Sequence, residues 1–163
     1  MKTKKSILIV DDEKDFGETL KAILGRVYEE VIYLSSPAEA QSLIKTRAFS
    51  LIISDVHMPE MPGPDFVRIV RAFGRLEPIV FLTGSSSNEL VLSALRLGAA
   101  DVIEKPIGAD ELVQSIDRIF EIEKRRETLA EESANRALEP ENLEKQRKMI
   151  GLLQIAKDKR KVG

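Results

Sequence analysis

The chain has 163 residues, enough for one compact domain with an appendage, and its 43% hydrophobic and 32% charged residues exclude both a disordered chain and a membrane protein. Its 25 basic and 27 acidic residues give a net charge of −2, which is not the strong positive charge of a nucleic-acid-binding domain. The absence of cysteine excludes a disulfide framework, a thiolate metal site and a thiol nucleophile.

Charge and hydropathy divide the chain into two regions. Residues 1–122 carry a net charge of −5, whereas residues 123–163 carry +3. The first apolar run is too short for a signal peptide, and no run approaches the roughly 20 residues that span a bilayer. We therefore expect a cytoplasmic protein without membrane association, in which a domain at residues 1–122 is followed by a charged helical extension at residues 123–163.

Short apolar runs alternate with amphipathic stretches over the first 107 residues. Continuous β-branched runs favour strands of a sheet that is covered on both faces, and five are predicted: Ile7–Val10, Val31–Leu34, Leu51–Ile53, Ile79–Leu82 and Val102–Ile103. Helical spacing of apolar residues predicts four intervening helices, around Phe16–Leu24, Ala40–Ile44, Phe66–Phe73 and Leu90–Leu97. This alternation predicts an open α/β fold with a doubly wound parallel sheet.

Local signals predict where the helices begin and end. Ser36 and Gly63 each precede a proline, as at an N-cap and first helical position, and Gly98 follows the fourth helix. A fifth helix is expected to start near Asp110 and to continue until Pro140 breaks the chain.

The extension after the break has one further amphipathic stretch, Leu143–Ala156. Its length leaves little room for a helix-turn-helix domain, and the basic run Lys157–Lys161 is typical of a solvated chain end. DNA binding is therefore not expected. We expect these helices to pack on the preceding domain, to pair with a second copy of the chain or to dock a downstream protein.

Polar residues follow the apolar runs at the positions where the strands end. Asp11, Asp12, Asp55, Thr83 and Lys105 follow the first, third, fourth and fifth runs. The carboxyl ends of parallel strands meet at one edge of an open sheet, which is where ligands bind. Three clustered carboxylates repel one another, and Mg²⁺, a hard cation that takes oxygen ligands, relieves this repulsion. The predicted metal ligands are Asp11, Asp12, Asp55 and the backbone carbonyl of His57.

The same cluster predicts phosphoryl transfer. A carboxylate can accept a phosphoryl group as an acyl phosphate, and Asp55 is the best candidate acceptor. Charge in such a transition state lies on the peripheral phosphoryl oxygens. Mg²⁺ can neutralise one of these oxygens, the Thr83 hydroxyl can donate to a second, and the Lys105 ammonium can pair with a third.

In these motifs the chain resembles the receiver (CheY-like) domain of two-component response regulators. The matching segments are Ile7–Glu13, Leu51–Gly63, Ile79–Gly84 and Gly98–Pro106, and the resemblance covers residues 5 to about 122. It implies a flavodoxin-like sheet in the order 2-1-3-4-5 and a cis peptide bond before Pro106. It also implies a histidine kinase or histidine phosphotransfer protein that phosphorylates Asp55, and hence a phosphoprotein that is a signalling switch rather than an enzyme with a separate substrate.

Two positions depart from the family pattern, and two alternatives stay open. Val102 stands where many receivers have an aromatic residue three positions before the lysine. His57 stands two residues after the acceptor, where its side chain is expected to overhang the site and to affect phosphate lifetime.

One alternative is a phosphate-independent pseudo-receiver adaptor. The other is an aspartate-nucleophile phosphatase, although such an enzyme would need an acid/base aspartate at the position of His57.

Overall fold

The structure is a computed structural model that describes residues 2–85, 87–137, 144, 145, 147–150 and 152. It divides the chain into two compact units, Met1–Ile116 and Asp117–Gly163.

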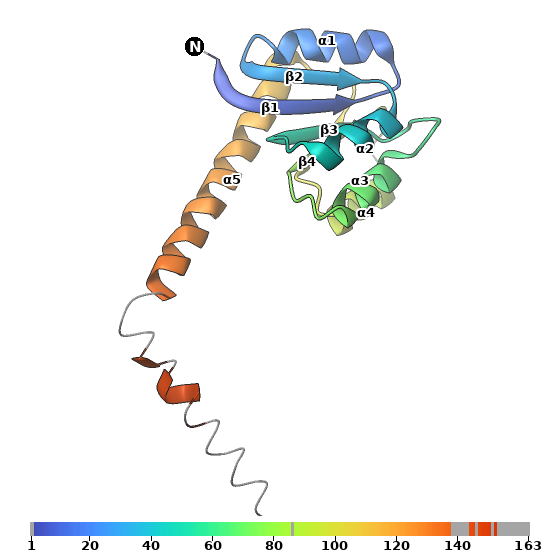
Figure 1. Ribbon diagram of the computed structural model, residues 1–163. Coiled ribbons are helices and arrows are strands. Elements are labelled where there is room, and N and C mark those ends of the chain that lie inside the picture. Colours follow the sequence, from blue (N-terminus) through green and yellow to red (C-terminus); the bar gives the residue numbers. More distant parts are fainter. Residues whose placement is uncertain (1, 86, 138–143, 146, 151, 153–163) are drawn as a thin grey trace, which may run out of the picture. The chain divides into compact units, whose positions relative to one another are not determined.

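A five-stranded parallel sheet forms the centre of the first unit. Its strands are β1 (Thr3–Val10), β2 (Tyr28–Leu34), β3 (Leu51–Asp55), β4 (Ile79–Thr83) and β5 (Asp101–Glu104). They lie in the order β2-β1-β3-β4-β5 (Figure 1), which confirms the predicted order. Both β1 and β2 begin earlier than their apolar runs: β1 starts with four polar residues that are exposed or partly exposed, and β2 starts with the buried Tyr28 followed by Glu29 and Glu30. In β1 the apolar run thus marks the buried part of the strand.

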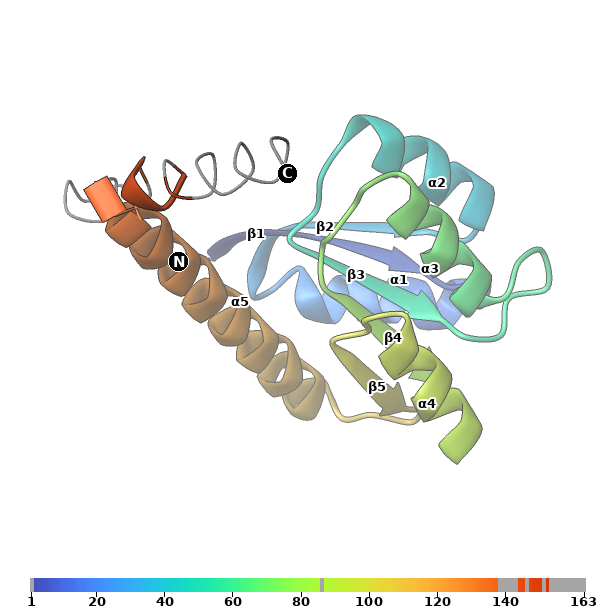
Figure 2. The same cartoon turned by 90° about the horizontal axis from the view of Figure 1, so that it is seen from below.

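Five helices connect or follow the strands. They are α1 (Lys14–Leu24), α2 (Pro37–Thr46), α3 (Gly63–Ala72), α4 (Asn88–Arg96) and α5 (Ala109–Ala137). Helices α2, α3 and α4 cover one face of the sheet, and α1 lies on the opposite face (Figures 1 and 2). The doubly wound α/β prediction is confirmed.

Side chains alternate along the strands, so apolar residues are buried on both faces of the sheet. Leu8, Val10, Ile52 and Phe81 pack with buried residues of α2, α3 and α4 in one apolar cluster. Successive strand residues point to opposite faces, so the intervening Ile7 and Ile9, which are also fully buried, point to the α1 side. Among the residues of α5 that belong to the first unit, Leu112 and Ile116 are buried.

The helix boundaries differ slightly from the sequence prediction. Ser36 occupies the N-cap of α2, but its hydroxyl donates to Glu60 Oε2 at 3.2 Å instead of capping the helix. Gly63 is the first residue of α3, with Pro62 at the N-cap, so the prediction that Gly63 is the N-cap is wrong by one residue. Gly98 has a φ of +69°, which fits its predicted place after α4.

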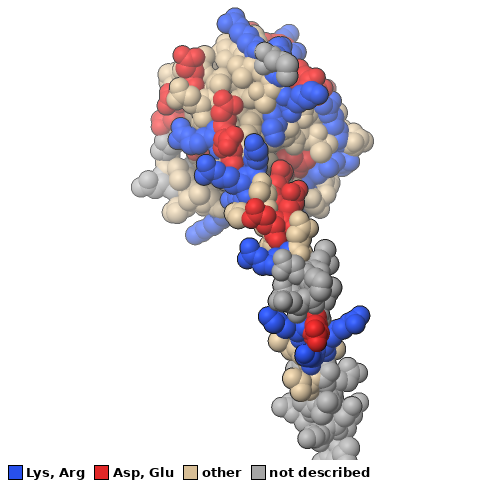
Figure 3. All heavy atoms as spheres, turned by 90° about the vertical axis from the view of Figure 1, so that its left-hand side faces the viewer, with Lys and Arg blue, Asp and Glu red and all other residues tan. Residues whose placement is uncertain are grey.

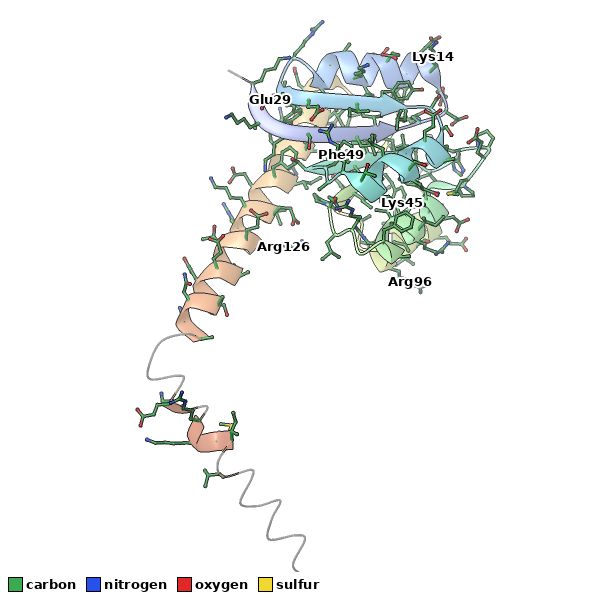
Figure 4. All side chains as sticks on the ribbon, in the orientation of Figure 1. Lys14, Glu29, Lys45, Phe49, Arg96 and Arg126 are labelled. Carbon is green, nitrogen blue, oxygen red and sulfur yellow. The ribbon has the colours of Figure 1, made fainter. Side chains whose placement is uncertain are left out.

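The second unit contains the rest of α5 and the described part of the extension. Ile122 and Leu129 are exposed, whereas Ile119 is buried. Arg126, labelled in Figure 4, donates to Glu123 at 2.8 Å. The described residues between 144 and 152 are helical and expose Met149, Ile150 and Leu152. The predicted break at Pro140 and most of the predicted stretch to Ala156 lie outside the described residues.

Acidic and basic side chains are interspersed on the face of the molecule shown in Figure 3. No helix within the described part of the chain is both long enough and apolar enough to cross a membrane.

Candidate functional site

The carboxyl edge of the sheet gathers the predicted site residues. Asp55 and Thr83 are the last residues of β3 and β4, while Asp11 directly follows β1 and Lys105 directly follows β5. In the parallel register Val10 pairs with Ser54 and Asp55 pairs with Leu82, so the strands end at nearly the same level. The topology alone thus brings these side chains to one edge.

The Lys105 ammonium joins two carboxylates at the centre of this edge. Its Nζ lies 2.8 Å from Asp11 Oδ2 and 2.8 Å from Asp55 Oδ1. The side chain of Asp11 is completely buried, that of Asp55 is 7% exposed and that of Lys105 is 13% exposed. The peptide bond between Lys105 and Pro106 is cis, as the resemblance implied.

Each carboxylate uses its second oxygen to accept a backbone N–H from the residue two positions further on. The Glu13 N–H donates to Asp11 Oδ1 at 2.9 Å, and the His57 N–H donates to Asp55 Oδ2 at 2.7 Å. These local turns fix the orientation of both side chains. Both carboxylates are therefore held at one end by their own backbone and at the other end by the same ammonium group.

Burial and charge act in opposite directions on these groups. Burial raises the pKa of Asp11, and the hydrogen bonds from Lys105 and from the Glu13 amide offset this rise only in part. Burial alone lowers the pKa of Lys105, but its hydrogen bonds to Asp11 and Asp55 outweigh that effect and raise the pKa overall. Lys105 is therefore charged at neutral pH.

The backbone of Asp55 is also fixed by the close approach of α3. A Cβ atom at Gly63 would lie 2.2 Å from the Asp55 carbonyl oxygen, and the Gly63 N–H donates to the Val56 carbonyl at 2.9 Å. Only glycine allows the start of α3 to pack this close to the end of β3.

Thr83 lies at this edge, but its hydroxyl points into its own loop. The hydroxyl donates to the Ser85 carbonyl at 2.8 Å and accepts from the Ser85 N–H at 3.2 Å. Val102 packs against the apolar cluster on the α2–α4 side of the sheet. It occupies the position where many receivers have an aromatic residue.

Two further predicted residues lie at the surface. Asp12 and His57 are both exposed, and no hydrogen bond or ion pair joins the Asp12 carboxylate to another residue that the structure describes. The geometry therefore brings together Asp11, Asp55 and Lys105, and leaves Asp12 and the His57 side chain at the rim.

The oxygen atoms at this edge are of the kind that bind a divalent cation. Among the described residues, no group of three or more His, Cys, Asp or Glu side chains is arranged to hold a metal ion. The Asp11 and Asp55 carboxylates nevertheless contact the same ammonium nitrogen, so they are close enough to share one cation. Carboxylate and carbonyl oxygens are ligands suited to Mg²⁺, which keeps several waters. The residues fit that ion, with Lys105 as the cation that it would displace.

Two residues that the sequence reasoning did not assign to the site contact Lys105. Glu13 Oε1 lies 3.5 Å from Lys105 Nζ, and the centre of the Phe16 ring lies 4.2 Å from it. Glu13 belongs to the acidic motif, so its sequence position was a usable signal. Phe16 fits the apolar pattern of α1, and nothing in that pattern separates a ring beside an ammonium from one in the core.

Comparison with known proteins gives concordant matches. Residues 7–117 match the response regulator receiver domain. The transcriptional regulatory protein CrdR of Helicobacter pylori is 32% identical over 118 residues, which are 72% of this chain and 55% of CrdR. The C4-dicarboxylate transport transcriptional regulatory protein DctD of Rhizobium meliloti is 32% identical over 139 residues, which are 85% of this chain and 30% of DctD.

Solved structures agree with the sequence matches. A CheY-like response regulator receiver domain protein from Methanospirillum hungatei superposes with a TM-score of 0.71 at 26% identity, over 76% of this chain and 99% of that chain. The chain spans about half or less of the length of the two curated relatives.

Proposed function

Because this chain belongs to the family of response regulator receiver domains, we propose that it is a phosphorylation-controlled signalling switch whose phosphoacceptor is Asp55. The observation that carries this proposal is the Lys105 ammonium held at 2.8 Å from both Asp11 and Asp55. A phosphate-independent adaptor would have no need for two buried carboxylates around one cation.

The proposed reaction forms one bond and breaks one. An oxygen of the Asp55 carboxylate attacks the phosphorus atom of the donor, and the bond to the donor's leaving group breaks, which gives an acyl phosphate. The donor is the phosphohistidine of a histidine kinase or of a histidine phosphotransfer protein. The chain catalyses only this transfer and its own later dephosphorylation by water.

We propose that Asp12, Asp55 and the His57 carbonyl hold Mg²⁺, with Asp11 contributing directly or through water. When bound, Mg²⁺ would supply positive charge to one phosphoryl oxygen. Lys105, which contacts Asp11 in the free protein, would pair with a second phosphoryl oxygen.

The switch itself is proposed to involve Thr83. Its hydroxyl has to leave the Ser85 carbonyl before it can donate to a phosphoryl oxygen, so phosphorylation would rearrange the loop between β4 and α4. Val102 stands where many receivers have an aromatic residue whose side chain can rotate on phosphorylation, and valine has no such ring. We therefore propose that movement of this loop transmits phosphorylation to the helical face.

The output that we propose is contact with other proteins through the helical face and the extension. CrdR and DctD are transcriptional regulators by name, but the chain spans only 55% and 30% of their lengths, and we do not transfer DNA binding from them. Phosphate exchange with an ATP-using kinase is a cytoplasmic activity, so the cytoplasm is the proposed compartment.

The test is the intact mass after incubation with a small phosphodonor such as acetyl phosphate. We expect one phosphoryl group to be added in the presence of Mg²⁺ and none in its absence. Asp55→Asn should abolish the addition, whereas Asp65→Asn, an exposed aspartate on α3, should leave it unchanged. A phosphate mapped to a serine or to His57 would contradict the proposal. The metal site is tested by Asp12→Asn, which should weaken Mg²⁺ binding and phosphorylation together.

A further inference from the structure

The backbone of Asp11 lies just beyond the last residue of β1 and is tied there to β2. Val10 pairs with Leu34 at the end of the two strands. Past this pair, the Asp11 N–H donates to the Leu34 carbonyl at 3.3 Å, and the Tyr33 hydroxyl donates to the Asp11 carbonyl at 2.9 Å. Asp11 is completely buried, and a buried carbonyl without a partner is unfavourable. The Tyr33 side chain therefore extends the pairing of β1 with β2 by one residue.

Tyr33 reaches this carbonyl by lying across α1 at Gly17. A Cβ atom at Gly17 would lie 2.1 Å from Tyr33 Cε2 and 2.5 Å from Tyr33 Cζ, which is too close for any side chain. Gly17 is buried within α1, where glycine is less favourable than alanine. The presence of glycine at position 17 is explained if this position must leave room for the Tyr33 ring.

We propose that Tyr33 is a positioning residue for Asp11 and that Gly17 provides the space that its ring requires. This inference rests on the proposed function, because it concerns the Asp11 carboxylate that would help to hold Mg²⁺. Tyr33 acts through the Asp11 backbone, and it thus adds a fifth strand, β2, to a site otherwise built from β1, β3, β4 and β5.

The effect on the carboxylate follows from the short aspartate side chain. A rotation of the Asp11 backbone moves its carboxylate away from Lys105 Nζ and from the Glu13 N–H, which donates to Asp11 Oδ1. The Glu13 amide therefore reports the position of Asp11 without any metal. The His57 amide, which donates to Asp55 Oδ2, belongs to the same site but is held from β3, so it is an internal control.

The first experiment compares the full chain with Tyr33→Phe, which keeps the ring and removes the hydroxyl. In metal-free protein, we expect amide hydrogen exchange to become about tenfold faster at Glu13 and to stay unchanged at His57, because only the Asp11 side of the site loses a hydrogen bond. Calorimetric titration with Mg²⁺ should show roughly tenfold weaker binding, the size expected when a group that orients a metal ligand is removed.

A merely structural role gives a different result. In that case Tyr33→Phe lowers the urea midpoint, but Glu13 exchange and Mg²⁺ affinity below the unfolding transition stay at their original values, which would overturn the inference. If the unmodified chain binds no Mg²⁺, the proposed function fails, and the Glu13 comparison in metal-free protein still decides whether Tyr33 positions Asp11.

The second experiment tests the pairing of Tyr33 with Gly17. Gly17→Ala should increase the equilibrium constant for unfolding in the original chain, because the methyl group displaces the ring. In a Tyr33→Ala background the same change should decrease that constant about two- to fivefold, as alanine normally does for a helix. An effect of the same sign in both backgrounds would show that Gly17 does not serve the tyrosine.

Discussion

At the level of single residues, Lys105 decides the charge balance of the site. Its ammonium is shared by the Asp11 and Asp55 carboxylates, and all three side chains are largely withdrawn from water. A pair of buried carboxylates is unfavourable without a compensating cation. In the structure Lys105 is the cation that compensates both carboxylates.

The first prediction concerns the removal of this charge in Lys105→Met. Burial already raises the pKa of Asp11 above 3.8, and losing Lys105 raises it further. A group with a raised pKa stabilises the fold below its unfolded value, and this contribution is lost as the pH rises through its folded value. We expect the free energy of unfolding to fall by about 3 kcal/mol at pH 7, and by less near pH 4, where Asp11 takes up a proton.

Urea unfolding measured across this pH range is the appropriate test. Lys105→Arg serves as the control, because it keeps a cation in the site. Equal losses of stability at pH 7 and pH 4 would contradict this electrostatic explanation.

The second prediction concerns Phe16, whose ring lies 4.2 Å from Lys105 Nζ. Phe16→Leu should destabilise the fold by about 1 kcal/mol more in the original chain than in the Lys105→Met background, because only the former has a cation for the ring to attract. Phe73→Leu is the matched control, since its ring contacts Lys45 at 5.0 Å on the surface. A double-mutant cycle with no coupling between positions 16 and 105 would show that Phe16 only fills space.

At the level of elements, the approach of α3 to β3 fixes the backbone of the proposed acceptor. The third prediction is that Gly63→Ala lowers the free energy of unfolding by about 2 kcal/mol, because the added methyl group meets the Asp55 carbonyl and the backbone has to move. Gly108→Ala, where no atom lies within 4 Å of the added Cβ, should change stability little. Thermal unfolding of both variants compares them directly, and equal melting temperatures would refute the packing argument.

The loop between β4 and α4 gives the fourth prediction. Thr83→Ala should still be phosphorylated, because the nucleophile is intact, but the α4 amides should show little change in NMR chemical shift on addition of beryllofluoride. In this variant the hydroxyl is absent. It therefore cannot leave the Ser85 carbonyl and donate to a phosphoryl oxygen instead. Thr83→Ser keeps the hydroxyl and should retain the shifts. Large α4 shifts in Thr83→Ala would show that the signal takes another route.

The strands were predictable from the sequence because burial on both faces forces continuous apolar runs, and the helices because their apolar residues recur at helical spacing. The site edge followed from topology, since Asp11, Asp55 and Lys105 each come directly at a strand end. The actual contacts were less accessible. Strand-end position does not tell whether a side chain points into the cluster, as Asp11 does, or to the surface, as Asp12 does. The interaction of Tyr33 with Gly17 depends on the packing of β2 against α1, which periodicity does not reveal.

At the level of the whole molecule, the two units have different chemistry. The first unit contains the sheet and the proposed phosphorylation site. The second exposes apolar residues on helical segments that also carry many charges, notably Ile122 and Leu129 on α5, and Met149, Ile150 and Leu152 beyond it. Exposed apolar side chains on amphipathic helices are typical of surfaces that associate with another helix.

The last prediction follows from these exposed residues. If Ile122 and Leu129 associate with a second copy of the chain or with the segment around 144–152, truncation after residue 122 should leave phosphorylation of Asp55 intact but change the assembly state or its dependence on phosphate. Light scattering of the full chain and of the truncated chain, each with and without beryllofluoride, measures this directly. Leu129→Glu in the full chain is the point control, because a charge at that exposed position should disrupt association without affecting the sheet. If all of these samples are monomeric, self-association is wrong, and the exposed residues are left as a docking surface for a different protein.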